Sequence, residues 1–251
     1  MDIAEFTESL RRDGQLLADA AEKAGAHAPV PTCPQWRVRD LLIHMGQVHR
    51  WATGFVEHGR QEPAPLPEAP RLPDHALADW LRDGCRKLVE TLRAAPADLS
   101  CWTFLPAPSP RAFWARRQAH ETAVHRADAE AALGAGHTAA DPAFAADGID
   151  ELLVGIHARE RSPMRTEMPK TLLIRATGAA GAAWKVALSD APPRAERIPL
   201  TAATGGDAAD CVLEGAASDL YFALWNRRSL DGITVTGEVS LARLWQERSG
   251  I

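Results

Sequence analysis

The chain changes character near residue 160, and this change limits what it can fold into. All nine histidines lie at or before His157, and apolar residues recur at helical spacing through this part. Beyond it, short runs of strand-forming residues alternate with glycine, proline and aspartate. A single type of secondary structure cannot account for both patterns. The sequence therefore predicts a helical part over residues 1–160 and a small α+β part over 165–251.

Proline-rich segments divide the first part into separate helices. The segments EPAPLPEAPRLP and LPAPSPR cannot continue a helix, so they are predicted to be surface loops. The helices are expected over residues 3–24, 37–58, 75–95, 112–133 and 142–160. Four long helices joined by loops of this length predict an up-and-down four-helix bundle, with the last helix added to it.

The second part reads as mixed α and β structure. Strands are predicted for TLLIRAT, WKVALS, ERIPLT, ADCVLEG and ITVTGE. Amphipathic helices are predicted for ASDLYFALWNRR and for the closing VSLARLWQERS. The fold class is therefore α plus α+β, with two domains.

Charge and cysteine usage exclude several classes of protein. The net charge of −5 argues against a nucleic-acid partner or an anionic membrane surface. The four cysteines are far apart, so a disulfide framework is not expected. The first residues lack the pattern of a signal peptide, and no apolar run approaches the roughly 20 residues that span a bilayer. We expect a cytoplasmic protein without a membrane partner.

A histidine and a carboxylate share one face of the helix expected over 112–133. Glu121 and His125 are four residues apart, which alone is more typical of a surface pair than of a metal site. The helix over 37–58 offers His44 and His49 on opposite flanks of its apolar stripe, so periodicity does not choose between them. Asp40 precedes His44 by four residues and is expected to accept its second ring N–H, which favours His44.

Two imidazoles and one carboxylate are the ligand set of an open metal site. Catalytic zinc sites use three protein ligands and keep one position free, whereas structural sites close all four. The predicted cofactor is a divalent metal, with zinc favoured; nickel, manganese and iron also accept these ligands.

The two segments that carry these candidate ligands resemble a known family. CPQWRVRDLLIHMGQVHRWA and WARRQAHETAVHRADAE resemble the signature segments of the mycothiol-dependent maleylpyruvate isomerase family, and ASDLYFALWNRRSLDGITVTGEVSLARLWQ is similar to the ending of its members. The resemblance covers nearly the whole chain. It implies a DinB-like four-helix bundle joined to a C-terminal α+β domain of the sterol-carrier (SCP2) type.

The resemblance also implies roles for particular residues. The metal ligands would be His44, Glu121 and His125, with supporting roles for His49, His120 and Asp128. An arginine of the tail lies near the active site in this family, and the matching position is Arg227 or the adjacent Arg228. We take Arg227 as the candidate catalytic residue. Mycothiol or a similar low-molecular-weight thiol is the implied cosubstrate, and the protein is expected to be a monomer or a homodimer.

The expected chemistry is activation of that thiol as a thiolate by the bound metal. A thiolate can add to a conjugated double bond and leave, which is cis–trans isomerisation, or remain attached, which is S-transfer; S-transfer is favoured here. Arg37, Arg39, Arg111, Arg116 and Arg117 are available to pair with a substrate carboxylate. Two alternatives stay open: a metal-dependent hydrolase, and a non-catalytic ligand-binding or carrier module.

Overall fold

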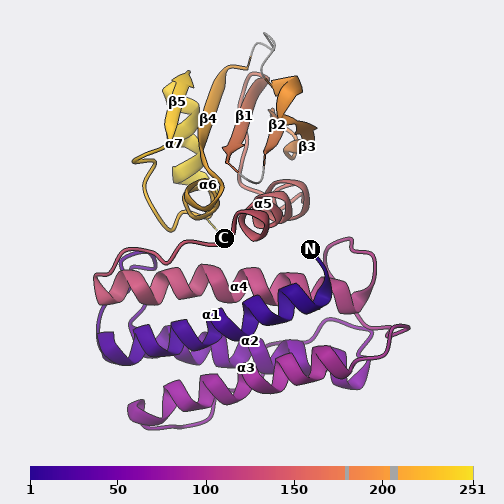
Figure 1. Cartoon of the computed structure of the whole chain (residues 1–251), viewed down its shortest axis with the longest axis vertical. Helices are drawn as coiled ribbons and strands as arrows, with labels where there is room; N and C mark the ends of the chain where they lie inside the picture. Colours follow the sequence, from indigo (N-terminus) through magenta and orange to yellow (C-terminus); the bar gives the residue numbers. More distant parts are fainter. Residues whose placement is uncertain (179–180, 204–208, 251) are drawn as a thin grey trace. The chain divides into compact units, whose positions relative to one another are not determined.

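The chain divides into two compact units. The computed structural model describes residues 1–178, 181–203 and 209–250. The first unit covers Met1–Thr138 and the second Ala139–Ile251. Figure 1 shows the helices of the first unit and the sheet and helices of the second. None of the helices in the described part of the chain is long and apolar enough to cross a bilayer.

Four long helices form the first unit. They are α1 (Ile3–Ala24), α2 (Val38–His58), α3 (Leu77–Ala94) and α4 (Pro110–Leu133), with a short 3-10 turn, η1 (Asp74–Ala76), before α3. Asp2 and Glu5 form a reciprocal capping box that starts α1. Ser109 caps α4 and Pro110 occupies its first position. These four helices confirm the helical domain predicted from the sequence.

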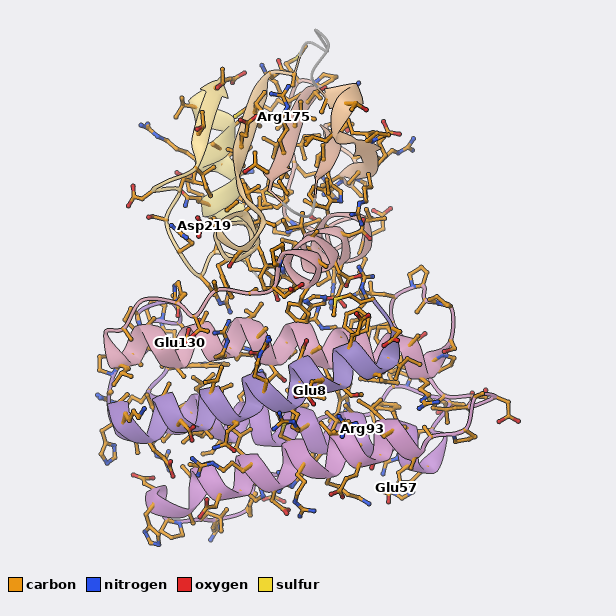
Figure 2. The ribbon with its side chains drawn as sticks, viewed as in Figure 1. Glu8, Glu57, Arg93, Glu130, Arg175 and Asp219 are labelled. Carbon is orange, nitrogen blue, oxygen red and sulfur yellow. The ribbon has the colours of Figure 1, made fainter. Side chains whose placement is uncertain are left out.

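Packing in the first unit places α1 against α3 and α4, and α2 against the same two helices (Figure 1). The core contains Leu17 of α1, Leu41 and Met45 of α2, and Leu81 of α3, all fully buried. The Glu8 carboxylate of α1 pairs with Arg93 of α3 at 3.4 Å (Figure 2). Because α4 is buried along most of its length, its polar side chains meet protein instead of solvent.

A five-stranded sheet is the centre of the second unit. Its elements in chain order are α5 (Pro142–Asp150), the π-helical turn η2 (Glu151–Ile156), β1 (Lys170–Thr177), β2 (Ala182–Leu188), β3 (Arg194–Pro199), the 3-10 turn η3 (Leu200–Ala203), β4 (Cys211–Ala216), α6 (Ala217–Leu224), β5 (Thr234–Gly237) and α7 (Val239–Arg248). The strand order is β3-β2-β1-β4-β5. Strands β1 and β4 are parallel, with Leu172 opposite Cys211, and the other neighbours are antiparallel. The α+β fold class is thereby confirmed.

The boundary between the two units comes earlier in the sequence than the predicted boundary at 160–165. The chain divides between Thr138 and Ala139, so α5 lies in the second unit. The reason lies in its partners. Trp225 Nε1 donates to the carbonyl of Gly148, and Trp184 Nε1 donates to the Asp150 carboxylate. These partners follow α5 by more than 30 residues, which helical periodicity does not detect.

The end of β5 depends on a glycine. Gly237 has φ +87°, and a Cβ added there would lie 2.4 Å from the backbone carbonyl oxygen of Asp210. We expect Gly237→Ala to lower the free energy of unfolding by about 3 kcal/mol, because both the positive φ and the backbone clash oppose it. Urea denaturation tests this against Gly136→Ala, where an added Cβ meets nothing within 4 Å. Equal effects of the two substitutions would contradict the prediction.

The π-helical turn ends at a buried histidine. His157 is 1% exposed, its Nδ1 lies 2.9 Å from Ser162 Oγ, and its ring packs edge-on against Trp245. Burial lowers the pKa of His157 from 6.5 to about 4. The unfolded chain therefore binds more protons than the folded chain between these pH values.

Stability should consequently fall as the pH drops through this range. The contribution of His157 is fully present above pH 6.5 and lost progressively towards pH 4, by roughly 3 kcal/mol at most. Urea denaturation at pH 7 and pH 5 should show a smaller difference for His157→Phe than for the parent protein. An identical pH dependence in both proteins would rule this contribution out.

Candidate metal centre

Helices α2 and α4 bring three metal-ligating side chains together. One ligand atom each from His44, Glu121 and His125 lies within 4.8 Å of the others. Nε2 of His44 is 3.7 Å from Oε1 of Glu121, and Nε2 of His125 is 3.5 Å from the same oxygen. His125 is buried, whereas the side chains of His44 and Glu121 are 27% and 26% exposed. The cluster is therefore held inside the helical unit but open on one side.

The spacing of these atoms fits a small divalent cation. Zinc binds imidazole nitrogen and carboxylate oxygen at about 2.0–2.1 Å, which places two ligands of a tetrahedral ion about 3.3 Å apart. The nitrogen–oxygen separations of 3.5 and 3.7 Å are close to that value. The donor set suits zinc and neighbouring transition metals. Three such ligands would leave one position of a tetrahedral ion for a small molecule.

Asp128 orients one of the two imidazoles. Its Oδ2 lies 2.7 Å from Nδ1 of His125, and its Oδ1 accepts a hydrogen bond from the hydroxyl of Thr32. With Nδ1 donating to Asp128, Nε2 on the side of Glu121 is the ring atom that would bind a cation in place of a proton. Burial opposes the charged form of His125, but hydrogen bonds to Asp128 and Glu121 raise its pKa overall. The thiol of Cys33 lies 3.7 Å from the same Asp128 oxygen.

Arg117 holds the second oxygen of the Glu121 carboxylate. Its Nη2 donates to Oε2 at 3.0 Å, and the Arg117 side chain is 4% exposed. Burial opposes ionisation of Glu121, but the neighbouring imidazoles of His125 and His44 and the charge of Arg117 keep its pKa well below the usual value. The carboxylate is therefore ionised at neutral pH and ready to bind a cation.

An aromatic ring from the loop before α2 covers both imidazoles. The centroid of Trp36 is 4.9 Å from that of His44 and 5.7 Å from that of His125, nearly parallel to the latter at 24°. The loop is closed by an antiparallel bridge between Pro29 and Arg37. Trp36 therefore restricts the rings and limits the approach of water on its side.

Family comparisons agree with this arrangement of parts. Residues 7–130 match the "Mycothiol maleylpyruvate isomerase N-terminal domain", and residues 143–244 match the "MDMPI C-terminal domain". The chain belongs to the mycothiol-dependent maleylpyruvate isomerase family. Two solved structures, of the mycothiol-dependent maleylpyruvate isomerase and of its histidine-to-alanine mutant, are similar with a TM-score of 0.64 each. They share 14% and 13% identity and cover 94% of this chain and 93% of their own, which shows a common fold. No curated protein matches the sequence.

Of the two candidate histidines on α2 in this isomerase-family chain, the geometry favours His44. His49 is fully buried, and its Nε2 lies 2.9 Å from Thr122 Oγ1. Burial lowers the pKa of His49 to about 3, so it stays neutral. Asp40 was expected to hold His44, but its carboxylate accepts the backbone N–H of Arg37 at the start of α2. That expectation was wrong, because capping the helix occupies the carboxylate.

The arginines considered for substrate binding in this family member have other contacts. Arg37 donates to the carbonyl of His27, Arg39 pairs with Asp74, and Arg111 donates to the carbonyl of Leu92. Local spacing already suggests the roles of Arg117 and Asp128, since i,i+4 and i,i+3 neighbours share a helix face. Trp36 and Thr32 come from a loop, where no periodic signal points to the site.

Arg227 and Arg228 follow α6 in the second unit. Arg227 is buried, and its Nη1 donates to the carbonyl of Trp225 at 2.8 Å. Arg228 pairs with the Asp219 carboxylate. Helix α6 ends at Leu224 instead of continuing through the arginines, because the left-handed Asn226 (φ +57°) breaks it. The catalytic role of Arg227 stays a prediction.

The contact between Asp128 and His125 can be tested through metal affinity. Asp128→Asn keeps the shape but removes the charge that orients the imidazole, so the Kd for Zn²⁺ should rise by about 10-fold or more. Competition with a chromophoric chelator measures this Kd. Asp40→Asn should leave it unchanged, because the Asp40 carboxylate accepts the backbone N–H of Arg37 at the start of α2. Equal Kd values for the two variants would refute the orienting role.

Proposed function

We propose that this chain is a metal-dependent, thiol-using enzyme whose cation is held by His44, Glu121 and His125. The observation that carries the proposal is the convergence of three ligand atoms within 4.8 Å. Asp128 and Arg117 already bond the remaining donor atoms of His125 and Glu121, as expected of a prepared ligand set. Family membership supports mycothiol as the thiol and an isomerase as the class of enzyme.

A divalent cation bound here would lower the pKa of a small thiol and stabilise the thiolate. Contacts within the chain already orient the side chains that would hold the cation. His125 is held in one tautomer by Asp128, and Trp36 covers the two rings on one side. The partial exposure of His44 and Glu121 leaves a path for the thiol and substrate.

The same site supports two related reactions. In isomerisation, a sulfur–carbon bond forms at a conjugated double bond, the resulting single bond rotates, and the sulfur leaves with the thiol regenerated. In S-transfer the sulfur–carbon bond is kept, and the substrate either takes up a proton after addition or releases its leaving group after displacement. The names of the matching family domains support isomerisation of maleylpyruvate as the first reaction to test, and S-transfer is the second.

Turnover with and without thiol tests the proposal. Zinc-loaded protein should convert maleylpyruvate, or conjugate an electrophilic halide, only when mycothiol is present. Turnover that needs zinc but no thiol would contradict the proposal and favour a hydrolase. Ligand binding without turnover, unchanged in His44→Ala, would favour a carrier.

A further inference from the structure

A buried arginine lies one helical turn before the carboxylate of the metal centre. Arg117 and Glu121 share a face of α4, and Arg117 Nη2 donates to Glu121 Oε2 at 3.0 Å. The other oxygen, Oε1, is the one that lies 3.5 Å from His125 Nε2 and 3.7 Å from His44 Nε2. The two oxygens of one carboxylate therefore face different partners.

This division of the carboxylate affects how it can bind a cation. A carboxylate is able to donate one oxygen or both to a metal ion. A charge-assisted hydrogen bond to Oε2 ties up that oxygen, and it is strong where the guanidinium is buried. Arg117 is only 4% exposed, so water does not readily replace Glu121 as its partner. Oε1 remains available to the imidazole side.

We propose that Arg117 is a positioning residue that confines Glu121 to donating a single oxygen to the cation. The inference rests on the proposed metal function and extends it. With one oxygen from Glu121 and one nitrogen from each imidazole, a bound cation would keep a coordination position open for the thiol. Arg117 would also withdraw negative charge from the carboxylate, which would leave that cation a stronger Lewis acid. Its task is thus different from binding a substrate carboxylate.

Metal affinity and cobalt spectroscopy test this role without measuring turnover. Arg117→Met should change the Kd for Zn²⁺ by about 10-fold or more, since the carboxylate loses its orientation and regains its second oxygen. The visible absorption of the Co²⁺-loaded variant should also weaken, because a second oxygen from Glu121 raises the coordination number. Arg111→Met is the matched control on the same helix, since its guanidinium contacts backbone carbonyls. An unchanged affinity or an unchanged spectrum in Arg117→Met would overturn the proposal.

A second pair of variants keeps the test decisive if Arg117→Met does not fold. Glu121→Gln and the double variant Glu121→Gln/Arg117→Met show the effect of the arginine when its carboxylate partner is absent. Removing both charges of the buried pair should also destabilise the fold less than removing one. If Arg117 acts through Glu121, the two should bind Zn²⁺ with Kd values within about twofold. A further loss in the double variant would overturn the proposal. If the parent protein binds no zinc, the proposed function fails; if it binds zinc and the Arg117 variants match it, only this inference fails.

Discussion

His44→Ala should abolish stoichiometric zinc binding and lower thiol-dependent turnover by at least about 1,000-fold. Of the three proposed ligands, α2 contributes His44 alone; Glu121 and His125 both lie on α4. Without it, two neighbouring side chains of one helix remain, one ligand fewer than catalytic zinc sites typically use. A catalytic metal contributes several kcal/mol to transition-state stabilisation, and each 1.36 kcal/mol is a factor of ten in rate. Metal analysis and steady-state kinetics measure both effects.

His58→Ala is the matched control for this substitution. His58 lies on the same helix but is exposed at its last turn. Zinc content and turnover should both equal those of the parent protein. Retention of zinc and turnover by His44→Ala would mean that the α2 histidine is no ligand.

Removing the metal should have the second large effect. Zinc at 1,000 times its Kd stabilises the folded state by about 4.1 kcal/mol, so metal-free protein should melt roughly 10 °C lower than zinc-loaded protein. Turnover should disappear with the metal, because no other group in the proposed mechanism ionises the thiol. Calorimetry before and after chelation gives the shift in Tm, and one equivalent of zinc should restore both Tm and turnover.

Magnesium is the control in the same experiment. It prefers six oxygen ligands and keeps much of its water, so a site with two imidazoles should not be restored by it. Equal Tm values for chelated and zinc-treated protein would contradict binding to the folded state. Turnover that survives chelation would separate the activity from the metal.

The elements were predictable from the sequence because their signals are local. Prolines separate the helices of the first unit, and the alternation of strand runs and turn residues locates the sheet. The unit to which α5 belongs is harder to predict, because some of its partners, among them Tyr221 and Trp225, follow it by more than 70 residues. Periodicity describes a helix face but does not identify the segment that covers it.

The candidate site was only partly predictable for the same reason. Residue types and the family resemblance suggested His44, Glu121 and His125, but the choice between His44 and His49 depends on which side of α2 meets α4. Buried polar residues on nearly every face of α4 remove the amphipathic pattern that would have shown its inner side. A cytoplasmic location, the monomer or homodimer state, and the absence of nucleic-acid and membrane partners stay predictions from the sequence.

X-ray absorption at the zinc edge, before and after adding mycothiol, tests the central claim most directly. The zinc-loaded protein should show only nitrogen and oxygen neighbours at about 2.0–2.1 Å, and mycothiol should add one sulfur neighbour at about 2.3 Å. Glu121→Gln should weaken zinc binding without adding a sulfur atom of the protein to the zinc neighbours. A sulfur neighbour already present without thiol, or a spectrum that mycothiol leaves unchanged, would contradict the account.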